Sequence, residues 1–193
     1  MRRSLLLLAT MALGVLMVGS VAQAAGSPRA NCLQEAQLLT SSTLTGYNVV
    51  VGNNRRADDF TSKATAGDDV FCGRGGNDSI ATLDAGDIFI GGAGDDYLHD
   101  FQNNNGTFDG GDGTDSVNFQ DTTGTFNGGA GNDSVNGNQG TFNGDSGDDS
   151  VKYNFNFGTF NGGDGVDTIE DNRGGAYTSV ESCSSSYDGG CSS

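Results

Sequence analysis

The chain has 193 residues and a formal net charge of −16, with 33 glycines, one proline and only 34% hydrophobic residues. This composition excludes collagen and leaves little apolar material for an ordinary globular core. The acidic balance also argues against nucleic acid or an anionic membrane as a partner, because both are bound by clustered Lys and Arg residues. We therefore expect the chain to bind cations.

Residues 1–24 have the features of a secretory signal peptide. Arg2 and Arg3 precede an apolar run over residues 5–18, and residues 22–24 (AQA) supply the small side chains that a signal peptidase reads. The run is shorter than the roughly 20 residues of a membrane-spanning helix. We therefore predict a secreted, extracellular protein with no membrane insertion.

Residues 25–63 are predicted to form an N-terminal cap. Ser27 and Pro28 are typical of a helix start, and we expect this helix to run to Leu39, followed by a short strand over residues 49–51. Such a cap would protect the first strands of the next segment from edge pairing.

Residues 64–170 repeat with a period of about 18 residues, which is typical of a solenoid. Each copy contains a six-residue glycine-rich turn that ends in aspartate. The turns are GRGGND (73–78), GGAGDD (91–96), GGDGTD (110–115), GGAGND (128–133), GDSGDD (144–149) and GGDGVD (162–167).

Two apolar columns accompany these turns, and they predict two short strands per coil. One column is Ile80, Leu98, Val117, Val135, Val151 and Ile169, and the other is Phe71, Phe89, Phe108, Phe126, Phe142 and Phe160. Because neighbouring residues of a strand point to opposite faces, the two columns would face each other as a narrow core. We predict an all-β parallel β-roll, or β-solenoid, of about six coils with small N- and C-terminal caps.

The pattern Gly-Gly-x-Gly-x-Asp-x-apolar-x resembles the RTX, or haemolysin-type, calcium-binding repeat. The resemblance covers roughly residues 67–170. It implies a parallel β-roll in which calcium ions lie between the turns of successive coils and are bound by aspartate carboxylates and turn carbonyls.

The opposite turns differ from the family pattern, because most of them lack aspartate. They end in Gly106, Gly124, Gly140 and Gly158, and only the two earliest keep an acid, Asp69 and Asp87. We therefore expect one calcium column and one largely metal-free column of Asn-rich turns, such as residues 103–105.

The chemistry of the residues independently favours calcium (Ca²⁺). Carboxylates about 5 Å apart would repel by roughly 3 kcal/mol per pair without a cation. Calcium accepts 6–8 carboxylate and carbonyl oxygens in a tolerant geometry, whereas zinc would need His or Cys, and His99 is the only histidine. The predicted metal ligands are Asp78, Asp96, Asp115, Asp133, Asp149 and Asp167, with Asp95, Asp148, Asn77, Asn132, Asp69 and Asp87 as further candidates.

Residues 171–193 are predicted to form a C-terminal cap, and the four cysteines of an exported chain are expected to form disulfides. Three pairings exist on paper. Cys72 and Cys183 would be about 24 Å apart at about 4.8 Å per coil, so a bond between them is disfavoured. We expect Cys32 to pair with Cys72, and Cys183 with Cys191.

The predicted function is a secreted calcium-binding module that folds on binding calcium and acts as a structural or binding protein. The alternative is an extracellular adhesion, glycan-binding or ice-binding protein that uses outward Thr-x-Asn residues. With one histidine, neither a His-paired zinc site nor a Ser-His-Asp triad with a spare base is available, so we expect no enzyme. The residues of the Thr-x-Asn face are Thr107, Asp109, Thr125, Asn127, Thr141, Asn143, Thr159 and Asn161.

Overall fold

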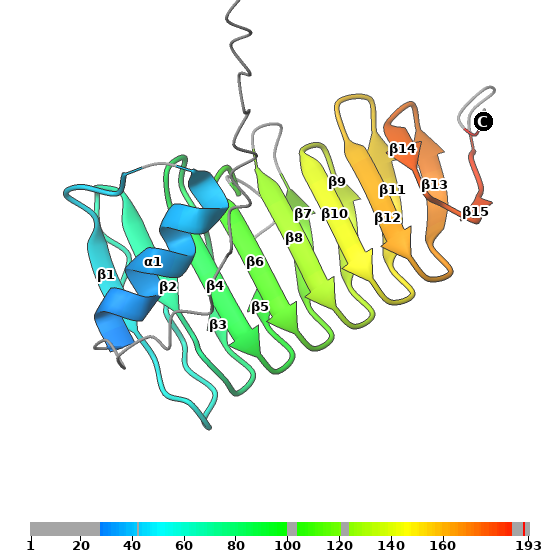
Figure 1. The fold of residues 1–193 in the computed structure, drawn as a ribbon. Coiled ribbons are helices and arrows are strands. Elements are labelled where there is room, and N and C mark those ends of the chain that lie inside the picture. The colour runs from blue at the N-terminus through cyan, green and yellow to red at the C-terminus, as the bar shows by residue number, and fades with distance from the viewer. Residues whose placement is uncertain (1–27, 42, 100–103, 121–123, 187–190, 192–193) are drawn as a thin grey trace, which may run out of the picture.

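The computed structural model describes residues 28–41, 43–99, 104–120, 124–186 and 191. The predicted signal peptide, Ser27 and Asn103 lie outside these residues. Within them the chain winds into a β-solenoid with one helix, α1 (Pro28–Thr40), beside its first coils (Figure 1).

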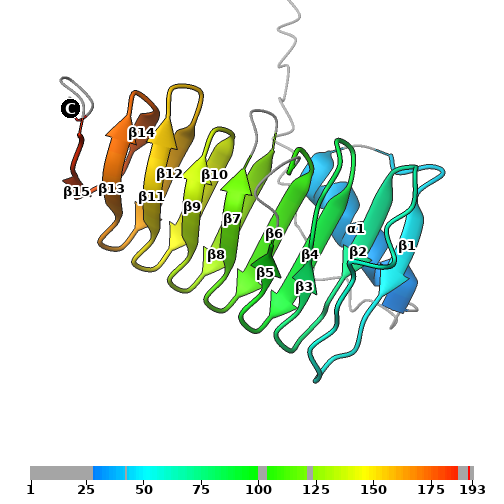
Figure 2. The same ribbon diagram turned by 180° about the vertical axis from the view of Figure 1, so that it is seen from behind.

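Two parallel sheets make up the solenoid, and every coil after the first contributes a strand to both. Sheet A has eight strands, in spatial order β1 (Asn48–Val51), β2 (Asp69–Cys72), β4 (Ile88–Ala93), β6 (Thr107–Asp112), β8 (Thr125–Ala130), β10 (Thr141–Ser146), β12 (Thr159–Asp164) and β14 (Ala176–Thr178). Sheet B has seven, in spatial order β15 (Ser182–Cys183), β13 (Thr168–Arg173), β11 (Ser150–Phe155), β9 (Ser134–Asn138), β7 (Ser116–Gln120), β5 (Tyr97–Leu98) and β3 (Ser79–Ile80) (Figure 2).

The predicted fold class is confirmed, and the solenoid continues past the six predicted coils at both ends. Strand β1 precedes the first repeat, and β14 and β15 follow the last one. The additional strands pair in parallel with their neighbours, as the repeats do.

The core lies between the two sheets and consists of the two predicted apolar columns. Each Phe pairs in register with the Phe of the next coil, and the rings of Phe108, Phe126 and Phe142 stack with centroids 4.9 and 4.8 Å apart. The aliphatic column of sheet B is buried as well. Because the ring spacing matches the strand spacing of about 4.8 Å, the stack is continuous from Phe89 to Phe160.

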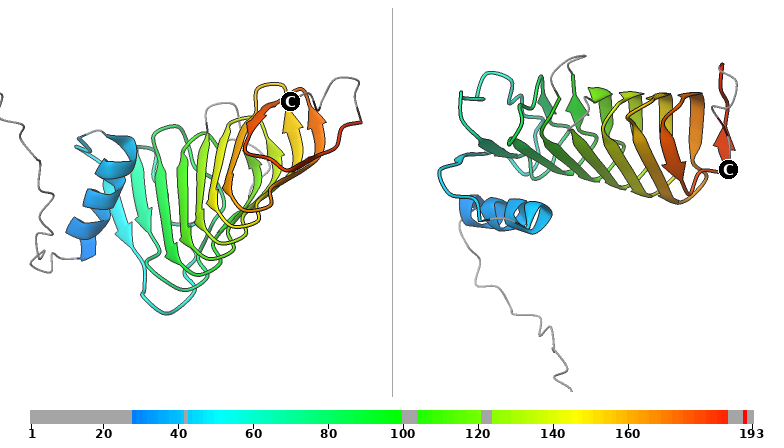
Figure 3. Two further views of the ribbon diagram at one scale, coloured as in Figure 1. Left: turned by 45° about the vertical axis from the view of Figure 1, so that its right-hand side comes forward. Right: turned by 90° about the horizontal axis from the view of Figure 1, so that it is seen from above.

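Helix α1 lies along the outer face of sheet A and covers β1, β2 and β4 (Figures 1 and 3). Its buried residues Cys32 and Ala36 pack with a second apolar cluster that includes Val70, Ile88 and Ile90. These residues alternate with the inward phenylalanines, so the first strands are apolar on both faces. Arg29 also donates a hydrogen bond from Nη1 to the carbonyl of Val49 in β1, over 2.7 Å.

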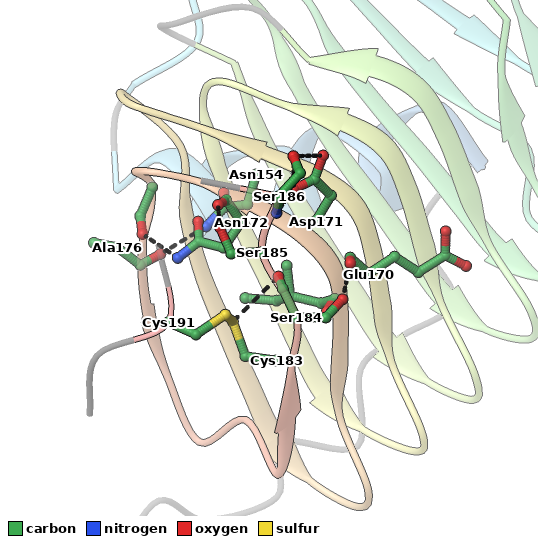
Figure 4. Close-up of a disulfide and its surroundings, with 12 residues drawn as sticks. Asn154, Glu170, Asp171, Asn172, Ala176, Cys183, Ser184, Ser185, Ser186 and Cys191 are labelled. Carbon is green, nitrogen blue, oxygen red and sulfur yellow. Dashed lines mark hydrogen bonds between the residues drawn. A yellow bond between two sulfur atoms is a disulfide. The ribbon is translucent and has the colours of Figure 1, made fainter. Parts of the chain in front are cut away.

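Two disulfides join the expected cysteines. Cys32 of α1 bonds to Cys72 of β2, with Cα atoms 6.0 Å apart, and Cys183 bonds to Cys191, with Cα atoms 5.9 Å apart (Figure 4). Two disulfides indicate a compartment outside the reducing cytosol. No helix among the described residues is long and apolar enough to span a membrane.

The last coil is held by polar side chains near the second disulfide. Ser186 donates its backbone N–H and its hydroxyl to the carboxylate of Asp171, each over 2.8 Å, and Arg173 donates to the same carboxylate over 2.8 Å (Figure 4).

Candidate metal-binding column

The glycine-rich turns stack at one edge of the solenoid, between the end of each sheet A strand and the start of the next sheet B strand. The second and fourth positions of most turns are glycines with φ between +103° and +150°. This left-handed backbone is accessible to glycine without strain and bends the chain sharply from one sheet into the other. The sixth residue of each turn therefore occupies an equivalent position in every coil.

The six aspartates that end these turns are buried, with at most 1% of each side chain exposed. One carboxylate oxygen, Oδ1, accepts the backbone N–H of the corresponding aspartate in the preceding coil. The N–H of Asp96 donates to Asp115 over 2.6 Å, and that of Asp115 donates to Asp133 over 2.7 Å. The same bond joins the other successive pairs, so the structure brings the six predicted carboxylates into one column.

The second carboxylate oxygen, Oδ2, is buried and has no hydrogen-bond partner among the described residues in any of the six aspartates. Each Oδ2 lies against the first glycine of its own turn. A Cβ added to Gly128 would overlap Oδ2 of Asp133 and would lie 2.9 Å from the carbonyl oxygen of Gly144 in the next coil. Two acceptor oxygens from successive coils therefore converge on the space that the first glycine leaves open.

This convergence recurs in every coil of the repeat. The first glycines, Gly73, Gly91, Gly110, Gly128 and Gly144, each face the Oδ2 of their own turn and the glycine carbonyl of the next turn. At Gly162, the carbonyl of Ser179 replaces that glycine carbonyl. An unpaired buried acceptor costs about 1–3 kcal/mol, so a row of them favours a cation, a proton or a donating water in this space.

The electrostatics of the column agree with this geometry. Burial raises the pKa of Asp96 to about 8, while the hydrogen bond from Asp78 lowers it and the neighbouring carboxylates raise it further. Burial likewise raises the pKa of Asp133 and Asp149 to about 7, and that of Asp78 and Asp115 to about 6. The net effect of the surrounding protein therefore disfavours the ionised form of these carboxyl groups.

The fifth turn positions, which include the candidates Asn77, Asp95, Asn132 and Asp148, are exposed. Their side-chain oxygens accept the backbone N–H of the same position in the next coil. For example, the N–H of Asp95 donates to Oδ1 of Asn77 over 3.1 Å, and that of Asp148 donates to Oδ1 of Asn132 over 2.9 Å. They form an outer hydrogen-bonded row along the turns and do not join the buried column.

The candidates Asp69 and Asp87 lie at the opposite edge of the solenoid. Both are buried, but protein donors already satisfy their carboxylate oxygens. Asp69 accepts hydrogen bonds from Asn48 and Thr65, and Asp87 accepts the backbone N–H groups of Asp69 and Asp84. This pair therefore lacks the orphan oxygens that mark the main column.

Buried asparagines complete most of this opposite edge. Asn138, Asn154 and Asn172 are at most 1% exposed, and the amide of Asn138 donates to the Oδ1 of Asn154 over 3.0 Å. The Nδ2 groups also bond to backbone carbonyls of later coils. Oδ1 of Asn138 is also buried without a donor among the described residues, but a neutral amide carries no charge, so this column needs no cation for charge balance.

Two acids that the sequence analysis did not single out extend the aspartate column at its ends. The carboxylate of Asp58 accepts the N–H of Asn53 in its own turn, and the N–H of Asp58 donates to Asp78 over 2.7 Å. At the other end, Glu181 accepts the N–H of Asp167 over 2.7 Å. Both are followed two residues later by an apolar residue, Phe60 or Cys183, as in the repeats. The turn before Asp58 is one residue longer than the others, which hides the pattern.

Among the described residues, no three side chains of His, Cys, Asp or Glu surround one point. The acids form a line along the solenoid, with one per coil. A metal ion on the column would therefore be bound by carboxylates from neighbouring turns together with backbone carbonyl oxygens and water. Carboxylate and carbonyl oxygens are the ligands that calcium prefers.

Comparison of the chain with protein-family models, with curated proteins and with solved structures gave no match. The assignment of the aspartate column as a candidate site is therefore based on the sequence pattern and the geometry alone.

Proposed function

We propose that this protein is a secreted calcium-binding β-roll of the RTX type, which folds on binding calcium and serves as a non-catalytic structural or binding module. The observation that carries the proposal is the row of buried Oδ2 atoms, each unpaired and each facing a carbonyl oxygen of the next coil. The two disulfides support export, because they require an oxidising compartment.

Calcium fits the column better than the other common metal ions. The space around each Oδ2 is bordered by hard oxygen atoms, and the described part of the column contains no imidazole or thiol group. Zinc prefers nitrogen and sulfur ligands, and magnesium demands a stricter octahedron and retains its water. Calcium would supply the positive charge that the stacked carboxylates lack.

The energy available from binding is large enough to control folding. At a free calcium concentration ten times the dissociation constant, each site adds about 1.4 kcal/mol to the free energy of unfolding. Five such sites between six aspartates would add about 7 kcal/mol, which is comparable with the whole stability of a typical domain. Sites of the extracellular type bind calcium at about 10⁻⁴ to 10⁻³ M, so such a protein would fold after export.

The rival explanation is that protons satisfy the column. A protonated carboxyl group at Asp133 would remove the charge and supply an O–H donor beside the carbonyl of Gly144. In that case calcium would have little effect on the fold, and the protein would be a metal-free solenoid.

Far-UV circular dichroism at about pH 7.5 separates the two explanations. We expect a β-sheet spectrum in calcium, its loss when a chelator is added, and its return with excess calcium. Magnesium at the same concentration is the control and should restore much less structure. Identical spectra in calcium and in chelator would contradict the proposal.

A second candidate function uses the outer face of sheet A beyond α1. The threonines Thr107, Thr125, Thr141 and Thr159 pair in register, so they form one row along the solenoid. A parallel row of asparagines is ordered by side-chain hydrogen bonds, such as the one from Asn143 to Asn127 over 2.9 Å. Ordered, evenly spaced hydroxyl and amide groups suit ice or a regular glycan surface.

Thermal hysteresis tests the ice-binding form of this candidate. Calcium-loaded protein should show a gap between melting and freezing points, and bulky residues at Thr125 and Thr141 should abolish it. Because both side chains point outward, the circular dichroism spectrum should remain unchanged. Absence of hysteresis in the unaltered protein would exclude ice binding.

A further inference from the structure

The outer face of sheet B carries a groove that neither the calcium column nor the Thr-x-Asn face accounts for. It has a volume of about 420 Å³ and crosses β5, β7, β9, β11 and β13 on the side shown in Figure 2. Its lining includes Tyr97 at one end, Ser116, Ser134 and Asn136 along its length, and Lys152 and Glu170 towards the other end.

The groove repeats the same hydrogen-bonding groups at successive rungs of the solenoid. Ser116, Ser134 and Ser150 pair in register, so their hydroxyl groups form a row with a spacing of about 4.8 Å. Asn118 and Asn136, two residues further along their strands, provide a second row. Each hydroxyl or amide can both donate and accept a hydrogen bond.

One of these groups has hydrogen-bonding capacity to spare. Asn118 is fixed by a 2.9 Å bond from its Nδ2 to the carbonyl of His99. In contrast, the Oδ1 of Asn136 is buried and has no donor among the described residues. A buried acceptor without a donor costs free energy, so a small rotation of this amide towards a ligand hydroxyl would be favourable.

Tyr97 provides an aromatic surface at one end of the groove. Its ring is packed edge-on against the ring of His99, with centroids 4.1 Å apart, which fixes its orientation. An aromatic ring held in this way can pack against an apolar ligand face while its hydroxyl group remains available for a hydrogen bond.

We propose that this groove binds an extended, neutral oligosaccharide that lies along the solenoid axis. A sugar chain presents hydroxyl donors and acceptors along its length, as the Ser and Asn rows do, and its pyranose rings have an apolar face for Tyr97. The charges of Lys152 and Glu170 offset each other within the groove. The net charge of −16 disfavours an acidic polysaccharide.

An extended peptide fits the groove less well. The backbone groups of β7, β9 and β11 are already paired with the strands on both sides, so a peptide cannot add to the sheet on this face. It would be limited to side-chain contacts with Ser and Asn residues.

Isothermal titration calorimetry in calcium with cellobiose through cellohexaose tests the proposal. We expect affinity to rise with chain length and then level off once the groove is filled. Tyr97→Ala and Asn136→Ala should each weaken cellohexaose binding about three- to tenfold, as expected for the loss of one ring contact or one hydrogen bond. Leu38→Ala, on α1, is the matched control, because Leu38 is exposed and lies outside both candidate binding surfaces, and it should bind as the unaltered protein does.

Three results would overturn the proposal. They are absence of cellohexaose binding, binding that Thr141→Ala, on sheet A, weakens while the groove variants do not, and stronger binding of a Ser- and Asn-rich peptide than of cellohexaose. Circular dichroism of each variant in calcium verifies the fold. If Asn136→Ala fails to fold, Lys152→Ala takes its place, because Lys152 is exposed on the same face. It should weaken binding by a similar factor.

Discussion

The backbone N–H of Asp96 donates to Oδ1 of Asp115 over 2.6 Å, while Oδ2 of the same carboxyl group is buried and has no partner in the part of the chain that the structure describes. One oxygen therefore fixes the register of neighbouring coils, and the other is left for an ion or a proton. The other aspartates of the column divide the roles of their two oxygens in the same way.

Asp115→Asn should change stability in opposite directions with and without calcium. The asparagine keeps an Oδ1 acceptor for Asp96 and places an Nδ2 donor beside the carbonyl of Gly128. In calcium-free buffer we expect the free energy of unfolding to rise by about 1–3 kcal/mol, because a buried acceptor is no longer unpaired. In saturating calcium it should fall by a similar amount, since a charged ligand is lost.

Urea unfolding followed by circular dichroism measures both effects. Asp112→Asn is the matched control, because Asp112 belongs to the same turn but is exposed, and it should change either value by less than about 0.5 kcal/mol. A variant at Asp115 that is less stable in both buffers would indicate a purely structural carboxylate.

The stability of the calcium-free protein should fall as the pH rises. Burial raises the folded-state pKa of Asp133 and Asp149 to about 7 and that of Asp96 to about 8. The pKa of aspartate in an unfolded chain is about 3.9. Between about pH 4 and pH 8 the folded state therefore binds more protons than the unfolded state. The stabilisation from protonated carboxyl groups is complete below about pH 4 and is lost as the pH passes 7 to 8.

Saturating calcium should reverse this dependence, because calcium requires the ionised carboxylates and competes with protons. Urea midpoints at about pH 5 and pH 8, in calcium and in metal-free buffer, test the prediction. We expect a difference of a few kcal/mol between the two pH values without calcium, at about 1.4 kcal/mol per unit of pKa difference. Metal-free stability that increases from pH 5 to pH 8 would contradict it.

The two disulfides should contribute unequally to stability. Cys32 and Cys72 are separated by 40 residues and Cys183 and Cys191 by 8, so a chain-entropy model gives about 4 and about 2.5 kcal/mol respectively. Replacement of Cys32 and Cys72 by serine should also loosen α1 and expose Val70, Ile88 and Ile90 to solvent.

Urea unfolding and the fluorescence of a hydrophobic dye compare the two paired replacements. We expect dye binding to increase only when the Cys32–Cys72 bond is absent. Equal losses of stability without any increase in dye binding would show that the bond is not needed to hold α1 on sheet A.

The sequence was sufficient to predict the solenoid and the column, because both arise from strict periodicity. An apolar residue two positions after each turn aspartate, and a phenylalanine half a period away, define both faces of the core without any long-range information. Coil spacing disfavoured a Cys72–Cys183 bond, since these residues lie at opposite ends of the stack, and the two expected pairings are the ones observed.

The position of α1 on the outer face of sheet A was not predicted, because it depends on which faces of the first strands are apolar and not on the repeat pattern. The signal was nevertheless present: Val70, Cys72, Ile88 and Ile90 stand at outward positions that carry Thr, Asn or Asp in most later coils. A strand with apolar residues on both faces requires a cover on each face. Similarly, the sequence does not distinguish Asp69 and Asp87 from metal ligands, since each accepts a hydrogen bond from the preceding coil, Asp69 from Asn48 and Asp87 from the N–H of Asp69.

The first glycine of each turn should be required for space and not for backbone conformation. Unlike Gly129 and Gly131 of the same turn, Gly128 does not have a positive φ, so its backbone suits alanine. The added Cβ would nevertheless overlap Oδ2 of Asp133 and approach the carbonyl of Gly144 to 2.9 Å. Gly128→Ala should therefore lower the free energy of unfolding by about 1–3 kcal/mol, the usual cost of overpacking, and should also weaken calcium binding.

Gly67→Ala is the matched control for this variant, because a Cβ at Gly67 would meet no atom within 4 Å and Gly67 does not have a positive φ either. It should leave both properties unchanged, or raise stability slightly by restricting the unfolded chain. Urea unfolding and a calcium titration followed by circular dichroism measure the two variants side by side. A Gly128→Ala protein that binds calcium as tightly as Gly67→Ala would place the ions away from the space beside the first glycine.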